Sequence, residues 1–137
     1  MLNKALDIAY KAHLGQTDKA GAPYILHPMR VALHCQTEDE KIVALLHDVV
    51  EDTPITLEEL KAQGFSDDVL AALKCLTKIK GEDYQIFIQR VATNPLAVKV
   101  KIQDLTYIIH SGFISGYQNR YGDNLKPPTN VYHRMTA

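Results

Sequence analysis

The sequence predicts an all-α protein, a bundle of short helices in a single domain. Apolar residues recur every three or four positions through most of the chain, which is the spacing of a helix with one buried side. Residues that favour helix N-termini precede most of these segments. No segment predicts a convincing strand, since VKVKI at residues 98–102 alternates with period two but follows a capped helix start. At 137 residues the chain can bury a core as one domain.

The N-terminal part is expected to hold two helices and a loop. The first helix is predicted over residues 2–12, where alanine, leucine and isoleucine share one side. Residues 15–23 contain two glycines and a proline without apolar periodicity, and this composition predicts a loop. His27-Pro28 opens the second helix, because proline is best tolerated in a first helical turn.

The helices that follow are predicted from their capping residues. Thr37 and Glu40 form a capping-box pattern, and the helix that they start ends before Pro54. Further helices are expected after Thr56, after Ser66, over residues 84–91 and after Asn94.

Beyond about residue 108 the helical pattern is lost. We therefore expect one folded domain over residues 1–110 and a poorly structured tail over residues 111–137. Glycine and asparagine are frequent in this tail, and it contains Pro127-Pro128.

Composition and charge exclude several classes of function. The 15 Lys+Arg and 16 Asp+Glu give a net charge of -1, so neither a nucleic acid nor a membrane surface is an expected partner. No apolar run approaches membrane-spanning length, and the N-terminus lacks the pattern of a signal peptide. Cys35 and Cys75 have no metal-ligand spacing and are interpreted as buried free thiols. We expect a cytoplasmic protein.

The stretch ALLHDVVEDT, residues 44–53, concentrates ionisable groups within one predicted helix. Taking His47 as the reference, Glu51 lies at about 40°, Asp48 at about 100° and Asp52 at about 140° around the helix. These four residues therefore share a polar arc, which can be a solvated surface or half of an active site. No Lys or Arg follows Lys41 in this arc to offset three carboxylates, and a bound divalent cation would relieve their repulsion.

Two more residues would complete a metal site. His27 heads its helix, and Asp104 lies in an apolar helix close to Lys99 and Lys101. Taken singly, such a His is more often a cap-region residue and such an Asp a surface ion pair. Together with His47-Asp48 they give two imidazoles and two carboxylates, a set that suits Mn²⁺, Fe²⁺ or Zn²⁺.

These residues belong to five stretches that resemble one protein family. In this order, AHLGQ, KAGAPYILHP, ALLHDVVEDT, LTKIKGEDY and NPLAVKVKIQDL are similar to the HD-domain hydrolases of the RelA/SpoT class. The stand-alone small alarmone hydrolases are the most similar group. The resemblance extends from about residue 2 to residue 105, and HDxVEDT preceded by PYIxHP is a specific combination.

The resemblance implies an all-α HD-domain helical bundle with one Mn²⁺, held by His27, His47, Asp48 and Asp104. It implies that Glu51 and Asp52 position and deprotonate the attacking water. The implied reaction removes pyrophosphate from the 3′ position of guanosine tetraphosphate or pentaphosphate. The expected partner is thus a small-molecule nucleotide, and the oligomeric state is left open.

Other residues are candidates for binding the nucleotide. Lys19, Lys99 and Lys101 would supply positive charge for a polyphosphate, with exposure to solvent as the alternative. Tyr24 and His13 would line the nucleotide pocket, with core packing as the alternative.

The chain departs from the family pattern in two places. Asp18-Lys19 stands where many relatives have an Arg-Lys pair, which removes a guanidinium that could stack on the purine. After Asp104, Ile108 and His110 replace the expected asparagine and acidic residue, and the tail is divergent. These changes favour two alternatives: an HD phosphohydrolase for another nucleotide, such as an adenosine alarmone or a 5′-nucleotide, or a catalytically weak nucleotide-binding module. No synthetase domain follows, so alarmone synthesis is not expected.

Overall fold

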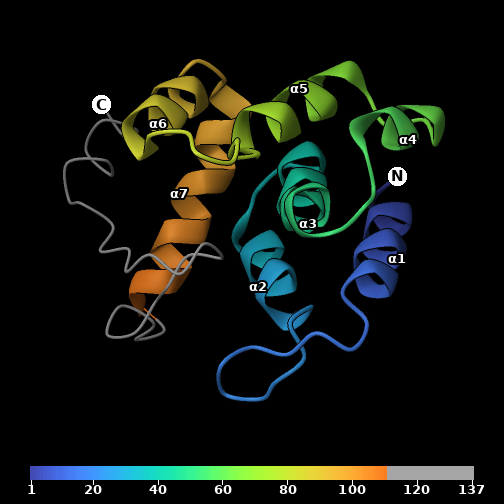
Figure 1. Cartoon of the computed structure of the whole chain (residues 1–137). Coiled ribbons are helices and arrows are strands. Elements are labelled where there is room, and N and C mark those ends of the chain that lie inside the picture. The colour runs from blue at the N-terminus through green and yellow to red at the C-terminus, as the bar shows by residue number, and fades with distance from the viewer. Residues whose placement is uncertain (111–137) are drawn as a thin grey trace.

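Seven helices follow one another in residues 1–110, the part of the chain that the computed structural model describes (Figure 1). They are α1 (Leu2–Ala12), α2 (Leu26–His34), α3 (Glu38–Asp52), α4 (Leu57–Ala62), α5 (Asp67–Leu76), α6 (Tyr84–Ala92) and α7 (Pro95–His110). Within this range the extended pairing is limited to an isolated bridge between Thr17 and Pro23, in the predicted loop. The all-α class is confirmed. The predicted tail, residues 111–137, lies outside the described residues.

The predicted capping residues start their helices as expected. Thr37 Oγ1 accepts a hydrogen bond from the Glu40 backbone N–H at 3.2 Å, and the Thr37 N–H donates to Glu40 Oε2 at 2.7 Å, which completes the capping box of α3. Thr56, Ser66 and Asn94 each accept a hydrogen bond from the backbone N–H three residues later. These side chains satisfy N–H groups that a helix leaves unpaired in its first turn. The second helix begins at Leu26, one residue before the predicted His27.

The helix α3 lies at the centre of the fold, and its middle is buried on every side. It packs against α1, α2, α5 and α7, as Figure 1 shows. All residues from Ile42 to Val49 are buried. Of the two interpretations of the polar arc, a solvated surface or half of an active site, the first is wrong for His47 and Asp48, which are 6% and 4% exposed. Neighbouring helices cover this side of α3.

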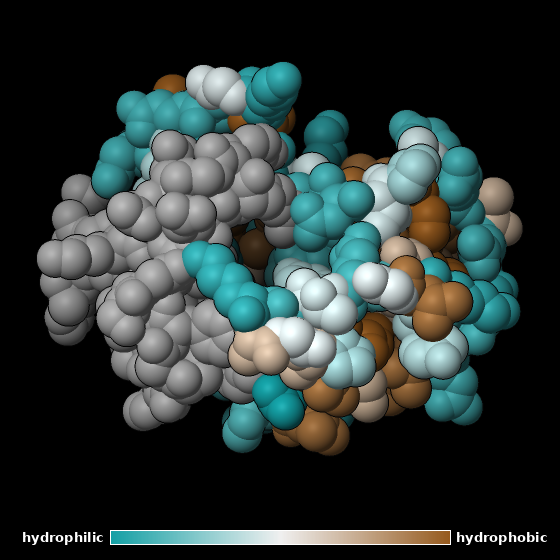
Figure 2. Space-filling model, turned by 60° about the horizontal axis from the view of Figure 1, so that its bottom comes forward, coloured by the Kyte–Doolittle hydropathy of each residue, from teal (hydrophilic) through white to brown (hydrophobic). Residues whose placement is uncertain are grey.

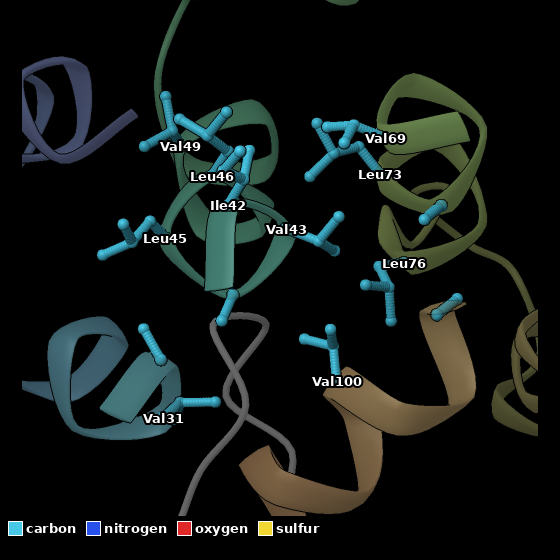
Figure 3. Packing of buried hydrophobic residues seen from close by; sticks show 14 of the residues in the cluster. Val31, Ile42, Val43, Leu45, Leu46, Val49, Val69, Leu73, Leu76 and Val100 are labelled. Carbon is cyan, nitrogen blue, oxygen red and sulfur yellow. The ribbon is translucent and has the colours of Figure 1, made fainter. Parts of the chain in front are cut away.

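The hydrophobic core surrounds this central helix (Figure 3). Leu45 points toward the side of α2, where Val31 lies, whereas Val43 points the opposite way, toward α5 and α7. Leu46 is completely buried between them. Burial of one such side chain contributes about 1.5–3 kcal/mol. The packing that stabilises the fold thus also fixes the position of the helix that carries His47 and Asp48.

The helix α1 divides its residues between core and surface. Ala5 and Ala9 are fully buried, and their small side chains allow close contact with α3. Leu6, Tyr10 and Leu14 are exposed on another side. In Figure 2, hydrophilic residues cover much of the middle of the face shown, and hydrophobic ones appear on the side where α1 lies. None of the helices in residues 1–110 has the length and apolarity needed to cross a membrane.

The two cysteines are free thiols that differ in burial. Cys35 is buried, as predicted, and its thiol donates to the Val31 carbonyl at 3.4 Å. Burial and the Glu40 carboxylate raise the pKa of the Cys35 thiol to about 11, so it stays protonated at neutral pH. Cys75 is only half-buried, which corrects its predicted burial.

The capping box predicts a dependence of stability on pH. Burial opposes ionisation of Glu40, but hydrogen bonds with Thr37 and the charge of Lys99 outweigh it and lower the pKa of Glu40 below its ordinary value of 4.5. A lowered pKa contributes stability above the ordinary value, and that contribution is lost as pH falls through the folded-state value. Denaturant unfolding at a series of pH values should therefore show wild type more stable than Glu40→Gln above pH 4.5.

The difference in unfolding free energy between wild type and Glu40→Gln should shrink as the pH falls below 4.5. The glutamine variant is a matched comparison because its side chain can accept the same hydrogen bond without a titratable charge. A difference that stays constant from neutral to acidic pH would contradict this account of Glu40.

Candidate metal centre

Four side chains from three helices meet near the middle of α3. His27 lies in the first turn of α2, His47 and Asp48 lie on α3, and Asp104 lies on α7. His27 Nε2 is 3.0 Å from Asp104 Oδ1, and His47 Nε2 is 3.3 Å from Asp48 Oδ1. Tyr24 connects the two pairs, because its hydroxyl donates to Asp48 Oδ2 at 2.7 Å and its ring lies 5.9 Å from that of His27. The structure thus brings together the four predicted metal ligands, which are up to 77 positions apart in the sequence.

The cluster is buried rather than solvated. Asp48 and Asp104 are 4% and 5% exposed, and His47 is 6% exposed. Buried charges are strongly unfavourable unless they are paired or bind a metal. Asp104 illustrates this: burial opposes its ionisation, but Lys101, His27 and His47 hold the pKa of its carboxyl far below the usual range. Asp104 in turn raises the pKa of His27 against the opposing effect of burial.

The orientation of His47 is set by the backbone of its own helix. His47 Nδ1 lies 2.8 Å from the Ala44 carbonyl oxygen, and since a carbonyl only accepts, Nδ1 is the donor. The second nitrogen, Nε2, is directed at Asp48 Oδ1. When the imidazole is neutral, this tautomer leaves the Nε2 lone pair available to bind a metal ion beside Asp48 Oδ1. Metal-binding histidines are usually held in this way by a carbonyl behind the ring.

The donor set fits a divalent transition metal. Two imidazoles and two carboxylates form a mixed nitrogen and oxygen set of the kind that such ions prefer. Among the side chains of residues 1–106, no three His, Cys, Asp or Glu groups surround one point in a geometry that could hold a metal ion. The four residues instead contact each other in pairs, His27 with Asp104 and His47 with Asp48. The chemistry, burial and orientation of the four residues fit a metal site.

Tyr24 and His13 lie beside the cluster. The Tyr24 hydroxyl donates to Asp48 Oδ2 at 2.7 Å, and its ring lies 5.9 Å from that of His27. The His13 ring packs against that of Tyr24 at a tilt of 56°, with 5.0 Å between ring centroids, and His13 is 2% exposed. His13 Nδ1 is 2.9 Å from Gln16 Oε1, whereas its buried Nε2 has no hydrogen-bond partner. Tyr24 thus contacts a predicted ligand directly, and His13 lies behind it.

The three predicted cationic residues lie in different places. Lys101 Nζ is 3.4 Å from Asp104 Oδ2 and lies over the Phe87 ring, 5.7 Å from its centroid. Lys99 instead lines a surface groove of about 610 Å³ at the N-terminus of α3, where it acts on Glu40. Lys19 is exposed on the loop before α2. Of these three, Lys101 reaches the cluster directly, through Asp104.

The two predicted catalytic carboxylates follow the cluster along α3. Glu51 is half-buried and Asp52 is exposed, one helical turn beyond His47 and Asp48. The carboxylate of Asp52 contributes to a raised pKa of the Tyr24 hydroxyl, after the larger effects of burial and Asp48. Because Asp52 follows Asp48 by four residues, the two side chains lie on nearly the same side of α3.

Three groups around the site were not predicted as part of it. They are the Ala44 carbonyl that orients His47, the Gln16 amide that contacts His13, and the Phe87 ring under Lys101. Phe87 was expected only in an apolar stripe, and its contact with Lys101 depends on how α6 packs on α7. The spacing of His47 and Ala44, three residues apart in one helix, is a sequence signal that could have predicted the first group.

Comparison with known proteins gives several similar chains. The chain is 34% identical over 115 residues to guanosine-3′,5′-bis(diphosphate) 3′-pyrophosphohydrolase of Aquifex aeolicus. The aligned region covers 75% of this chain and 16% of the relative. The chain is 41% identical over 80 residues to the Borreliella burgdorferi protein of the same name, covering 56% of this chain and 12% of the relative. The chain thus spans about a sixth or less of the length of these curated relatives.

The bifunctional (p)ppGpp synthase/hydrolase SpoT of Escherichia coli is 31% identical over 123 residues, covering 77% of this chain and 17% of SpoT. Among solved structures, a metazoan orthologue of SpoT described as hydrolysing ppGpp has the same fold. Its TM-score is 0.70 at 23% identity, with 98% of this chain and 91% of that chain covered. The model of the HD domain family matches residues 5–95, which contain both the loop before α2 and His47-Asp48. This chain belongs to the HD domain family.

Proposed function

We propose that the chain is a metal-dependent hydrolase that removes the 3′-pyrophosphate of (p)ppGpp-type nucleotides. The observation that carries this proposal is the buried cluster of His27, His47, Asp48 and Asp104. The similar proteins named as (p)ppGpp hydrolases support the choice of substrate. The proposed ion is Mn²⁺, because a set of two imidazoles and two carboxylates favours a transition metal over a hard, oxygen-preferring ion.

When bound, the ion would polarise the 3′ phosphoryl group and lower the pKa of the attacking water. Glu51 or Asp52 would take the proton from this water, since both lie one turn beyond the proposed ligands. Attack on the phosphorus breaks its bond to the 3′ oxygen, so pyrophosphate leaves and the ribose 3′-hydroxyl is restored with a proton.

The remaining charge of the substrate would be met by nearby side chains. Lys101, at 3.4 Å from Asp104, brings an ammonium group to the edge of the cluster. Lys19 would approach the polyphosphate from the loop before α2. Tyr24 would line the substrate site next to His27, and the buried His13 would support its ring from behind. A small nucleotide in the cytoplasm is the proposed substrate.

A second candidate function is hydrolysis of another nucleotide, and Asp18 favours it. Asp18 Oδ1 accepts hydrogen bonds from the backbone N–H groups of Ala20 at 2.9 Å and Ala22 at 3.0 Å. This side chain therefore shapes the loop and presents no guanidinium to a purine. An adenosine 3′-pyrophosphate or a 5′-nucleotide would fit such a pocket.

The function is tested with a panel of nucleotides. Purified protein with Mn²⁺ is incubated with guanosine and adenosine 3′-pyrophosphates and with plain 5′-nucleotides, and released pyrophosphate or phosphate is measured. Release of pyrophosphate from the guanosine compounds is the expected result. Preferential turnover of the adenosine compound or of a 5′-nucleotide would support the second candidate. Binding without turnover would overturn both and leave a nucleotide-binding module.

Removal of the metal is expected to abolish the activity. Treatment with EDTA followed by exchange into metal-free buffer should bring turnover to background, and added Mn²⁺ should restore it better than Mg²⁺. The rate is measured after each addition, with the untreated protein in the same buffer as control. Full activity in metal-free buffer would contradict the metal site.

A further inference from the structure

Tyr24 is held in place by the loop that precedes it. The Tyr24 backbone N–H donates to the Gln16 carbonyl at 2.9 Å, which closes the loop, and the isolated bridge joins Thr17 to Pro23. The ring is packed between those of His13 and His27, with centroid distances of 5.0 and 5.9 Å. Because both its backbone and its ring are held, the Tyr24 side chain has a fixed position, in which its hydroxyl donates to Asp48 Oδ2.

The two carboxylate oxygens of Asp48 therefore face different groups. Oδ2 accepts the Tyr24 hydrogen bond at 2.7 Å, while Oδ1 faces His47 Nε2 at 3.3 Å. Side chains of adjacent helical residues diverge by about 100°, so Asp48 and His47 converge only if the carboxylate is turned toward the imidazole. The Tyr24 hydroxyl holds it in that orientation.

We propose that Tyr24 is a positioning residue that holds Asp48 as a one-oxygen ligand of the metal, with Oδ1 directed at the ion and Oδ2 held by the Tyr24 hydroxyl. This proposal rests on the metal centre of the proposed function. A carboxylate that binds an ion through both oxygens occupies two coordination positions. Restricting Asp48 to one oxygen keeps a position for water or for a substrate oxygen, which a hydrolase requires.

The hydroxyl is suited to this task at neutral pH. An ordinary phenol ionises only at about pH 10, so the Tyr24 hydroxyl is a donor at neutral pH. Phenylalanine at this position would keep the ring and its packing against His13 and His27. The substitution therefore removes the hydrogen bond alone.

The test is metal binding by the full chain without substrate. The Kd of Mn²⁺ is measured by isothermal titration calorimetry for wild type, Tyr24→Phe and Tyr10→Phe. Loss of a group that orients a ligand typically weakens metal binding by roughly 10- to 100-fold, and this is expected for Tyr24→Phe. Tyr10 is 53% exposed on α1, so Tyr10→Phe should bind as wild type does and serves as the matched control.

A second measurement separates positioning from mere stabilisation. The water-proton relaxation of bound Mn²⁺ reports the number of coordinated waters, and Tyr24→Phe should lower it as the freed carboxylate binds through both oxygens. Unchanged Kd and relaxation would overturn the proposal, whatever happens to the melting temperature of the metal-free protein. Wild type that binds Mn²⁺ but hydrolyses no nucleotide would overturn the proposed function and leave this inference intact. Wild type that does not bind Mn²⁺ would overturn both.

Discussion

Replacing His47 with alanine is expected to remove the bound metal and to lower kcat/KM at least about a thousandfold. The Lewis-acid contribution of a metal is worth several kcal/mol, and about 4 kcal/mol corresponds to three orders of magnitude in rate. His47 is a buried ligand candidate whose Nδ1 is held by the Ala44 carbonyl, which leaves Nε2 to bind the ion, and alanine removes this nitrogen. Asp48→Ala should behave in the same way. Metal content is measured by elemental analysis and turnover by release of pyrophosphate.

Glu51→Gln provides the contrast, because Glu51 is proposed to reach the water and not the ion. This variant should retain the metal and lose about 10²- to 10⁴-fold in kcat, the usual contribution of a general base. Comparing the loss of kcat in Asp52→Asn with that in Glu51→Gln shows which of the two carboxylates contributes more to proton transfer. Glu58→Gln, at an exposed position on α4, is the matched control for a loss of charge and should change neither quantity. If Glu51→Gln stripped the metal as completely as His47→Ala does, the proposed division between ligands and base would be wrong.

Much of the secondary structure could be predicted because its determinants are local. The capping box of Thr37 and Glu40 needs only four consecutive residues, and the structure confirms it together with the caps at Ser66 and Asn94. A backbone N–H in a first helical turn finds its partner within three residues regardless of the rest of the fold. Helix starts were therefore predicted to within a residue or so, as at Leu26.

The surroundings of α3 could not be predicted in the same way. Periodicity shows that the polar residues of α3 share one side, but the burial of His47 and Asp48 depends on the other helices that pack against α3. The four clustered residues could be proposed from their chemistry, whereas their pairing, His27 with Asp104 and His47 with Asp48, depends on long-range packing.

The spacing of the two lysines on α7 could have predicted which of them contacts Asp104. Lys101 lies three residues before Asp104 and hence on nearly the same side of the helix, whereas Lys99 lies five residues before it, about 140° away. Spacing alone therefore favoured Lys101 as the partner of Asp104, and the structure has this contact at 3.4 Å. The Phe87 ring beneath Lys101 comes from α6, and no local pattern relates the two residues.

Leu46→Ala is expected to lower the free energy of unfolding by about 3–5 kcal/mol, the range for a leucine truncated in a well-packed core. Leu46 is completely buried in α3, where helices pack on several sides and leave little freedom to fill the cavity (Figure 3). The loss is a large part of the about 5–15 kcal/mol that stabilises a typical domain. For a chain of this size it should lower Tm by about 10 °C or more.

The measurement is chemical and thermal unfolding of the metal-free protein, with Leu33→Ala as the control for the same truncation. Leu33 is 77% exposed on α2, so its truncation should change stability by no more than about 0.5 kcal/mol. Because Leu46 precedes His47 directly, the two predictions on α3 also separate folding from chemistry. Leu46→Ala should bind Mn²⁺ at low temperature, where it remains folded, whereas His47→Ala should not bind it at any temperature. A cost for Leu46→Ala below about 1 kcal/mol would mean that the centre of α3 is loosely packed, and a rigid metal centre could not then be built on it.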